Sequence, residues 1–399
     1  MKKNLFFAAS TILLLAACNN NDEALTSQND INPQIPNEFT ITNDEAKEIL
    51  SFFVNDGATT RSDGKTITVK DYKVRNVEVQ TDDNTEIVPV YEYTTENENG
   101  EEGYSIVIGD RRIQKVLVQV DKGSLADTTD IPPLKWFIKS IPHIIRTDIH
   151  EYNKNHGKGV TTRNLNDFFY ESNGPLLTTA WGQGYPYNKQ TPLACDTAYN
   201  YTSNNGHCSV GCVPVAIGQL LAYYNKPSTL SWTQILSSPY ITSNSSQTVI
   251  NQVSNLLYNI GTTISVNYNP NRPTSSRVPG SYYEFPYSSV IPGCISSYTI
   301  TYYGFQVFNL QTVIMNIQAN KPVYLSAETS SYPIGGHDWI CDGWKRHTYA
   351  VNDYYDYLYM NWGWNGYSNG YFYIDPYNMS FYADTDFTLN NNFLMSTHI

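Results

Sequence analysis

Apolar residues recur at two different spacings in the first third of the chain, and each spacing predicts a different kind of element. Between residues 46 and 53 they follow helical spacing, directly after Thr42 and Glu45, which have the form of a capping box. Runs rich in β-branched and aromatic residues come next. They predict strands at residues 66–69, 73–79, 87–93, 104–108 and 115–120. Residues 38 to about 122 are therefore predicted to form a small α+β unit.

Longer helices are predicted further along the chain. Residues 134–152 form an amphipathic pattern, in which Pro142 predicts a kink or a break. Residues 212–225 carry an apolar face, and Pro214 fits there because the first turn of a helix does not need its N–H. Residues 249–260 have the same spacing. The last part of the chain turns to strands, predicted at residues 323–327, 338–342, 357–361 and 370–374.

Composition narrows the classes of function. Hydrophobic residues make up 41% of the 399 residues, which is enough to build cores. The formal net charge of −12 argues against a nucleic-acid partner, because phosphate contacts need a Lys/Arg surface. The H-E-x-x-H motif of metalloproteases is absent. We therefore expect neither a metal nor another cofactor.

The chain begins like an export signal. Two lysines precede residues 5–15, an apolar stretch too short to span a membrane. It ends in Leu-Ala-Ala-Cys at residues 15–18, which resembles a bacterial lipobox, so we expect cleavage before Cys18 and a lipid on its thiol. An ordinary signal peptide with an incidental cysteine is the alternative. Residues 19–37 are polar and predict a flexible tether. With the export signal and the lipid, this predicts a protein at the bacterial cell envelope, or one released outside it after maturation.

Once Cys18 is assigned to the lipid, an odd number of cysteines remains. Exported chains favour disulfides, so at least one of the others is expected to be a free thiol that can react. The count alone does not say which. The five are Cys195, Cys208, Cys212, Cys294 and Cys341.

Cys212 is the best candidate for that thiol, because it begins the helix predicted at residues 212–225. A helix N-terminus lowers the pKa of a thiol through its dipole and its free N–H groups, and the same N–H groups can bind an oxyanion. Gly211 lets another backbone approach closely. The structural alternative is a buried core cysteine or half of a disulfide.

His337 is the candidate general base. It follows two glycines and begins an apolar strand, so the strand would hold the imidazole while the glycines leave room for a substrate backbone. It lies about 125 residues after Cys212, close to the roughly 130–150 residues found between cysteine and histidine in papain-type enzymes. A core histidine with satisfied nitrogens is the alternative. Among its competitors, His207 is too near Cys212, His347 is expected in a polar turn, and His398 is at the terminus.

Two further segments carry residue types that a cysteine–histidine site uses. Residues 361–366 read Asn-Trp-Gly-Trp-Asn-Gly, in which Asn361 can orient an imidazole and Trp362 or Trp364 can shield it from water. A tryptophan-rich turn that packs a sheet would look the same. Gln183, upstream of Cys212, can donate a second hydrogen bond to an oxyanion, although a glutamine is more often an exposed polar residue.

Taken in order, these segments resemble the streptopain family of papain-like cysteine proteases, which bacteria export as zymogens. The resemblance rests on residues 176–188, 211–213, 335–337 and 361–366. It implies an α+β fold in which a small α+β inhibitory prodomain precedes a papain-like peptidase domain with a helical part and an antiparallel sheet. The chain is then expected to consist of a signal peptide at 1–18, the tether at 19–37, a prodomain with activation linker at 38–165, and the peptidase domain at 170–399.

The resemblance also implies roles. Cys212 would attack a peptide carbonyl of a protein or peptide substrate, and His337 would take its proton and pass it to the leaving amine. Gln183 and the Cys212 N–H would hold the oxyanion, and Gly336 would contact the substrate backbone. The prodomain would block the cleft until cleavage between about residues 157 and 173 releases it. Whether Asn361 or Trp362 orients the imidazole stays open, so a cysteine–histidine dyad is the safer expectation.

The chain departs from the family pattern after His337. Asp338 stands where the family has a small apolar residue, and we expect it to face away from the site as an ordinary polar strand residue. Cysteine pairing is equally open, and joining Cys195 to Cys208 and Cys294 to Cys341 is one of three possible arrangements of these four.

Parts of the sequence also fit two functions other than a protease. Residues 366–370 fit the G-x-S-x-G pattern of serine esterases, but a strand-like run follows where that pattern needs a helix. A lipid-anchored surface protein that binds glycans or host proteins without catalysis remains the alternative.

Overall fold

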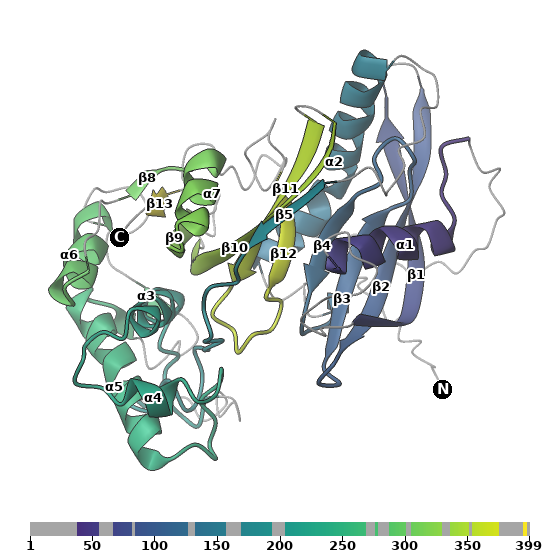
Figure 1. Cartoon of the computed structure of the whole chain (residues 1–399). Coiled ribbons are helices and arrows are strands. Elements are labelled where there is room, and N and C mark those ends of the chain that lie inside the picture. Colours follow the sequence, from purple (N-terminus) through teal and green to yellow (C-terminus); the bar gives the residue numbers. More distant parts are fainter. Residues whose placement is uncertain are drawn as a thin grey trace, which may run out of the picture. The chain divides into compact units, whose positions relative to one another are not determined.

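The chain divides into two units, residues 1–37 and residues 38–399. The first, with the predicted signal peptide, Cys18 and tether, lies outside the described residues, and so do Cys195 and the predicted domain boundary at 165. The elements below belong to the second unit (Figure 1). The computed structural model describes residues 38–55, 67–81, 84–126, 132–156, 169–193, 204–268, 276–277, 287–300, 305–328, 336–350, 353–374 and 394–396.

A helix and a series of strands open the second unit, as the sequence predicts, and the strands form an antiparallel meander. Helix α1 (Asn43–Val54) begins after Thr42, whose N–H donates to the Glu45 carboxylate at 2.7 Å while its hydroxyl accepts from the Glu45 N–H at 3.3 Å, so the capping box forms. The two strands expected within residues 66–79 are one strand, and a register shift between Val69 and Asp71 interrupts its pairing. The strands are β1 (Ile67–Gln80), β2 (Thr85–Asn97), β3 (Glu102–Ile108) and β4 (Val116–Val120).

Helix α2 (Pro132–His156) runs through Pro142 without a break. A proline in a helix interior costs about 3 kcal/mol, because it removes one hydrogen bond and crowds the preceding turn. Burial of an apolar face offsets that cost. Phe137 of α2 meets Phe372 edge-on, with ring centroids 5.4 Å apart, so the helix packs against the sheet. Among the residues of α2 whose burial the structure describes, the buried apolar side chains are Leu134, Phe137, Ile141, Ile144, Ile145, Ile149 and Tyr152.

The predicted helices at 212–225 and 249–260 are present, whereas three helices, at 232–235, 287–297 and 310–318, were not predicted. The strand predicted at 370–374 has those bounds. The remaining elements are β5 (Phe169–Asn173), α3 (Cys212–Tyr223), α4 (Trp232–Ile235), α5 (Gln247–Thr263), β6 (Asn267–Tyr268), β7 (Ser276–Arg277), α6 (Tyr287–Ser297), β8 (Phe305–Val307), α7 (Leu310–Gln318), β9 (Val323–Glu328), β10 (Gly336–Ala350), β11 (Asp353–Asn361), β12 (Gly370–Ile374) and β13 (Leu394–Ser396).

One antiparallel sheet runs through the second unit, which confirms the α+β expectation. Its order is β1-β2-β3-β4-β12-β11-β10-β9-β13-β8, and β5 pairs with β10 beside this path. The predicted prodomain and the predicted peptidase domain meet where β4 pairs with β12, with Val120 opposite Gly370 and Val118 opposite Phe372. Gly370 is needed there because a Cβ would overlap the carbonyl oxygen of Gln119. The two regions therefore share one hydrogen-bonded sheet.

Two apolar cores form, and β10 separates them. The first surrounds α1, α2 and most of the sheet, and the second surrounds α3 and α5. Alternate residues of a strand face opposite sides, and accordingly Trp339 and Cys341 belong to the first core while Ile340 belongs to the second. Helix α3 thus packs on one face of β10 and the aromatic first core lies on the other.

Buried lysines join the predicted prodomain to the rest of the sheet. The Lys115 ammonium donates to the Asp148 carboxylate of α2 at 2.7 Å and lies 3.6 Å from the Tyr373 ring centroid. The Lys345 ammonium donates to the carbonyl of Phe53 in α1 at 3.1 Å. His347, expected in a polar turn, is instead buried in β10, with its ring 4.9 Å from that of Phe53.

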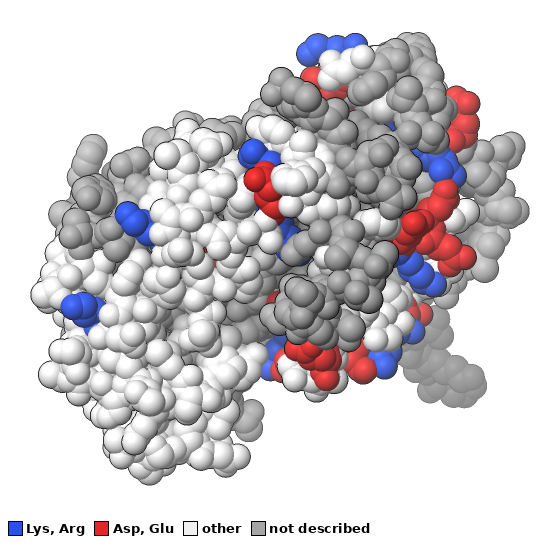
Figure 2. Space-filling model, viewed as in Figure 1, with Lys and Arg blue, Asp and Glu red and all other residues white. Residues whose placement is uncertain are grey.

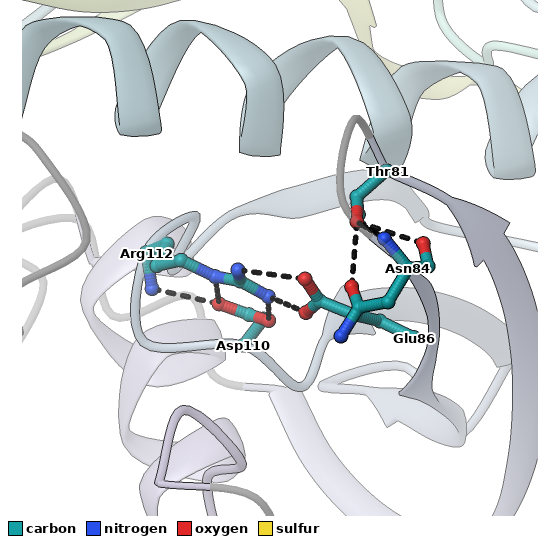
Figure 3. A network of polar contacts seen from close by, with 5 residues as sticks. All are labelled: Thr81, Asn84, Glu86, Asp110 and Arg112. Carbon is teal, nitrogen blue, oxygen red and sulfur yellow. Dashed lines mark hydrogen bonds and ion pairs between the residues drawn. The ribbon is translucent and has the colours of Figure 1, made fainter.

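A buried ion network holds the connection between β3 and β4 (Figure 3). The Arg112 guanidinium donates to Asp110 Oδ2 at 2.7 Å and to Glu86 Oε2 at 2.6 Å. In the adjoining turn between β1 and β2, the Thr81 hydroxyl donates to the Asn84 carbonyl at 2.8 Å. The Arg112 and Asp110 side chains are each only 2% exposed. Removing Arg112 would therefore leave Asp110 as an uncompensated buried charge, whereas removing Asp110 would leave Arg112 paired with Glu86 alone.

The surface shown in Figure 2 is unevenly charged. Acidic and basic side chains gather over α1 and β1–β3, whereas the visible face over α3–α5 carries few. Contacts on that second face therefore depend mainly on apolar and hydrogen-bonding groups. Within the described residues, no helix is both long enough and apolar enough to cross a membrane.

The suggested disulfide between Cys294 and Cys341 is wrong. Both residues are thiols, and they lie in different cores, Cys294 in the second and Cys341 in the first. Burial raises the pKa of both, that of Cys294 to about 11, so neither is an activated nucleophile. The other suggested pair includes Cys195 and lies partly outside the described residues.

Candidate active site

Cys212 is the first residue of α3 and is held by the burial of the helix behind it. Gly211 has φ +99° and ψ 155°, a conformation that is essentially limited to glycine, so this glycine sets the direction in which the chain enters the helix. Residues 213–222 are all buried, whereas Cys212 itself is half-buried. The second core therefore fixes the helix and presents its first residue at the margin.

The sulfur of Cys212 contacts a carboxylate. Its thiol donates to Oδ2 of Asp338 at 3.7 Å, and the Tyr324 hydroxyl donates to Oδ1 of the same carboxylate at 2.8 Å. Burial, and after it the negative charge of Asp338, raises the pKa of the Cys212 thiol above its usual range. The expectation that Asp338 faces away from the site is therefore wrong, and Cys212 is held as a protonated thiol.

His337 lies in an aromatic pocket on β10. Its Nε2 is 2.9 Å from the carbonyl oxygen of Trp362, and because a carbonyl only accepts, Nε2 carries the proton. The ring stacks with Trp339 at 5.9 Å between centroids and meets Trp364 edge-on at 5.0 Å. Burial lowers the pKa of His337 to about 4, and the hydrogen bond to Trp362 offsets only part of this. The imidazole is therefore neutral near neutral pH.

The structure does not bring Cys212 and His337 together. His337 and Asp338 are neighbours on one strand, so their side chains face opposite sides of the sheet. Asp338 contacts Cys212 on the α3 side, whereas His337 contacts Trp362 of the first core. Gly336, the expected contact for substrate backbone, is the first residue of β10.

The backbone of Gln183 lies near the start of α3, and its role as an oxyanion donor stays a prediction. Its carbonyl accepts from the N–H of Val210 at 3.0 Å, two residues before Cys212. Asn361 has no part in orienting His337 in this arrangement, because its amide donates to the Thr179 carbonyl at 2.8 Å and accepts from another side chain, described below. The orienting contact comes instead from the backbone of Trp362.

A model of the peptidase C10 family matches residues 181–233 and 228–372, which include Gln183, Cys212, His337 and the 361–364 segment. The chain belongs to the peptidase C10 family. It is accordingly a cysteine endopeptidase, as the sequence predicts.

Relatives of this C10 peptidase include streptopain of Streptococcus pyogenes serotype M28, which is 25% identical over 313 residues and aligns with 70% of this chain and 73% of the relative. Streptopain of serotype M1 matches with the same identity and coverage. Among solved structures, a fragment of Prevotella intermedia prointerpain A with a cysteine-to-alanine mutation covers 82% of this chain and 99% of its own, with 18% identity and a TM-score of 0.48.

Sequence reasoning missed Gln219, a buried residue of the C10 site region. Its Nε2 donates to Oδ1 of Asn361 at 3.1 Å, and its Oε1 accepts from the N–H of Trp181 at 2.9 Å. The available signal was composition, because Gln219 is the one polar residue among the buried residues 213–222. A polar side chain inside an otherwise apolar helix needs a hydrogen-bond partner, and that partner is often another segment of a site.

In this C10 peptidase the described arrangement is latent. The thiol is protonated and next to a carboxylate, and the imidazole is neutral and on the other face of β10. A cysteine protease needs the opposite state, with a thiolate beside an imidazolium. Among the described residues, no group of three or more His, Cys, Asp and Glu side chains is arranged to hold a metal ion.

Proposed function

We propose that this C10 peptidase is an exported zymogen that hydrolyses peptide bonds through Cys212 and His337, and that residues 38–165 keep it latent. The position of Cys212 carries the proposal. It combines a thiol at the N-terminus of a buried helix with Gln183 in the neighbouring segment. The helix N–H groups and the Gln183 amide are two sources of hydrogen bonds for an oxyanion at that thiol.

Activation must bring the imidazole to the α3 side of β10. A general base acts within about 2.6–3.2 Å of the proton that it accepts. His337 is the second residue of β10, so moving it breaks the terminal pairs with Glu328 and Ala327, the hydrogen bond to Trp362 and the ring contacts of the pocket. Asp338 leaves the sulfur in the same movement. The ring then exchanges an apolar pocket for a thiolate partner, which favours its protonated form.

The reaction follows from that pair. The Cys212 thiolate attacks the peptide carbonyl, and the oxyanion is held by the Cys212 N–H and Gln183. The His337 imidazolium gives its proton to the leaving amine, which leaves an acyl group on the sulfur. Water then attacks the acyl group and gives a proton back to His337, and the thiolate leaves. Gly336 is open to the substrate backbone because it has no side chain.

Latency depends on the contacts that hold residues 38–165 in the sheet. Strand β4 pairs with β12, and Lys115 of the same region lies against Tyr355 and Tyr373. Cleavage within 157–168 would cut the covalent link between α2 and β5 and leave β5 paired with β10 in the peptidase domain. The β4–β12 pairing must separate afterwards, so cleavage and activation are two distinct steps.

Export and membrane attachment are supported by the sequence alone. Cys18 follows a short apolar stretch and precedes a polar tether. Growth with a labelled fatty acid tests this directly. The wild-type chain should carry the label and Cys18→Ser should not, whereas a labelled Cys18→Ser chain would overturn the lipid assignment.

Hydrolysis of a protein substrate by the purified, cleaved chain tests the function. Wild-type protein should hydrolyse the substrate, iodoacetamide should abolish the activity, and Cys212→Ala should have none. A non-catalytic surface protein would instead bind its ligand equally well as wild type and as Cys212→Ala, and neither would hydrolyse the substrate.

A further inference from the structure

Gln219 lies inside α3 where the helix has no contact with water. It is 0% exposed, and every neighbour within residues 213–222 is apolar or glycine. It follows Cys212 by seven residues, which is about two helical turns, so both lie on the same side of the helix. Burying an amide is unfavourable unless its donor and its acceptor both find partners.

Both ends of the Gln219 amide are satisfied, and each contacts a different segment of the site. Oε1 accepts from the N–H of Trp181 at 2.9 Å, and Nε2 donates to Oδ1 of Asn361 at 3.1 Å. The Asn361 amide passes the connection on by donating to the carbonyl of Thr179 at 2.8 Å. Because a backbone N–H only donates and a carbonyl only accepts, these two ends fix the orientation of both amides.

The hydrogen bonds of Gln219 to Trp181 and Asn361 form a bridge between the segments that carry the proposed chemistry. Trp181 is two residues before Gln183, and its ring packs over α3 at Gly218, where any side chain larger than hydrogen would collide with Leu257. Asn361 ends β11 and precedes Trp362, whose carbonyl holds His337. All of these contacts are present while β4 is still paired with β12, so they form in the precursor before His337 moves.

We propose that Gln219 is a positioning residue for peptide hydrolysis. Its side chain fixes the Gln183 segment and the end of β11 against the helix that carries Cys212, so that the oxyanion donor and the imidazole meet at the sulfur. The inference rests on the proposed function and adds to it the residue that sets its geometry. An apolar replacement would fill the same volume and leave the Trp181 N–H and the Asn361 carbonyl oxygen without their bridge.

Two substitutions separate positioning from packing. Gln219→Met keeps the length of the side chain and removes both hydrogen bonds. Gln219→Glu keeps the acceptor for Trp181 but can donate to Asn361 only when the carboxyl is protonated, so its contact should return in acid. Gln252→Met is the matched control, because the Gln252 amide makes the same kind of bridge to the N–H and hydroxyl of Ser231, on α5 and away from the site.

The measurement is kcat and KM of the cleaved enzymes on one peptide substrate between pH 5 and 8, with thermal unfolding of each variant. We expect Gln219→Met to lower kcat about 10- to 100-fold with little change in KM, since a small misplacement of reacting groups has an effect of this size. Gln219→Glu should recover activity relative to wild type as the pH falls, and Gln252→Met should keep wild-type kcat.

Wild-type kcat in a folded Gln219→Met enzyme would overturn the positioning role. If that variant does not fold, Gln219→Glu decides, because an activity ratio to wild type that does not change with pH contradicts the bridge. Absence of hydrolysis by the wild-type enzyme would instead overturn the proposed function itself, so the two failures are distinguishable.

Discussion

The Cys212 sulfur donates its hydrogen bond to the Asp338 carboxylate at 3.7 Å, on the face of β10 opposite to the imidazole of His337. The carboxylate occupies the side of the strand that the imidazole must reach. Tyr324 holds it there with a 2.8 Å hydrogen bond. A negative charge next to a thiol opposes thiolate formation, which is the reverse of what catalysis needs.

Replacing Asp338 should make Cys212 more reactive in the uncleaved precursor. Asp338→Asn removes the charge and keeps the size of the side chain, so the thiol pKa should fall, although burial, the larger cause, remains. We expect the iodoacetamide labelling rate of Cys212 at pH 8 to rise several-fold, since each unit of pKa changes the thiolate fraction about tenfold. Tyr223→Phe, which removes a tyrosine hydroxyl bonded to the Asn320 carbonyl, serves as the control. Equal labelling rates in wild type and Asp338→Asn would contradict the assignment.

Acid should favour release of His337 from its pocket. Burial lowers its pKa from an ordinary value near 6.5 to about 4. The neutral, buried ring therefore stabilises the latent arrangement fully above pH 6.5, and this contribution is lost as the pH falls from 6.5 towards 4. The full shift is worth about 3 kcal/mol. A Cys212→Ala precursor, which cannot cut itself, should show the His337 ring titrating near pH 4 by NMR.

The NMR measurement must follow the His337 ring itself, because protonation of different buried groups changes the stability of the fold in opposite directions. Burial also lowers the pKa of His347, which acts in the same direction as His337. Burial raises the pKa of Asp342 to about 7, so acid relieves the penalty of burying that carboxylate and stabilises the fold. A midpoint near 6.5 for the His337 ring itself would contradict the buried pocket.

Gly211, the glycine before Cys212, should not tolerate a side chain. Gly211→Ala forces an L-residue into φ +99°, ψ 155°, a strain on the order of 1–3 kcal/mol. We expect lower thermal stability and weaker peptidase activity after cleavage, because the helix N-terminus must shift. Gly293→Ala is the matched control, because a Cβ there has open space and the residue lies in α6. Equal unfolding temperatures for the two alanine variants would contradict the backbone strain at Gly211.

Lys115, the buried lysine between β3 and β4, should hold the predicted prodomain in place. Lys115→Met leaves the Asp148 carboxylate without its ammonium partner, and breaking a buried pair on one side costs roughly 3–5 kcal/mol. We expect a large loss of precursor stability to denaturant. Lys47→Met removes an exposed pair with Asp44, which is worth at most about 1 kcal/mol, and should change little. Similar losses in both variants would argue against the role of Lys115.

Local features of the fold were accessible from the sequence. The Thr42–Glu45 capping box and the start of α3 at Cys212 each depend on a few neighbouring residues, so a short pattern specifies them. The pairing of β4 with β12 could not be predicted, because residues about 250 positions apart meet only in the folded chain. The sequence also predicts two strands where β1 is one. Polar residues separate the two apolar runs, and they look the same whether the strand ends there or continues through a register shift.

The sequence indicates candidate site residues, but it does not indicate their protonation states or the face of β10 on which each lies. Strand alternation alone places His337 and Asp338 on opposite faces, but it does not say which face meets α3. That choice depends on the second core, where Ile340 and Tyr324 pack beside the helix. The neutral imidazole and the protonated thiol follow from burial, which short sequence motifs do not record.

The rate of Cys212 alkylation in the cleaved enzyme at pH 6, mapped by mass spectrometry and compared with that of a His337→Ala enzyme, tests the central claim most directly. A thiolate–imidazolium pair predicts fast labelling in wild type and a rate at least about tenfold lower without the imidazole. Equal rates in the two enzymes, or a Cys212 that labels no faster than the buried thiols of Cys294 and Cys341, would contradict it.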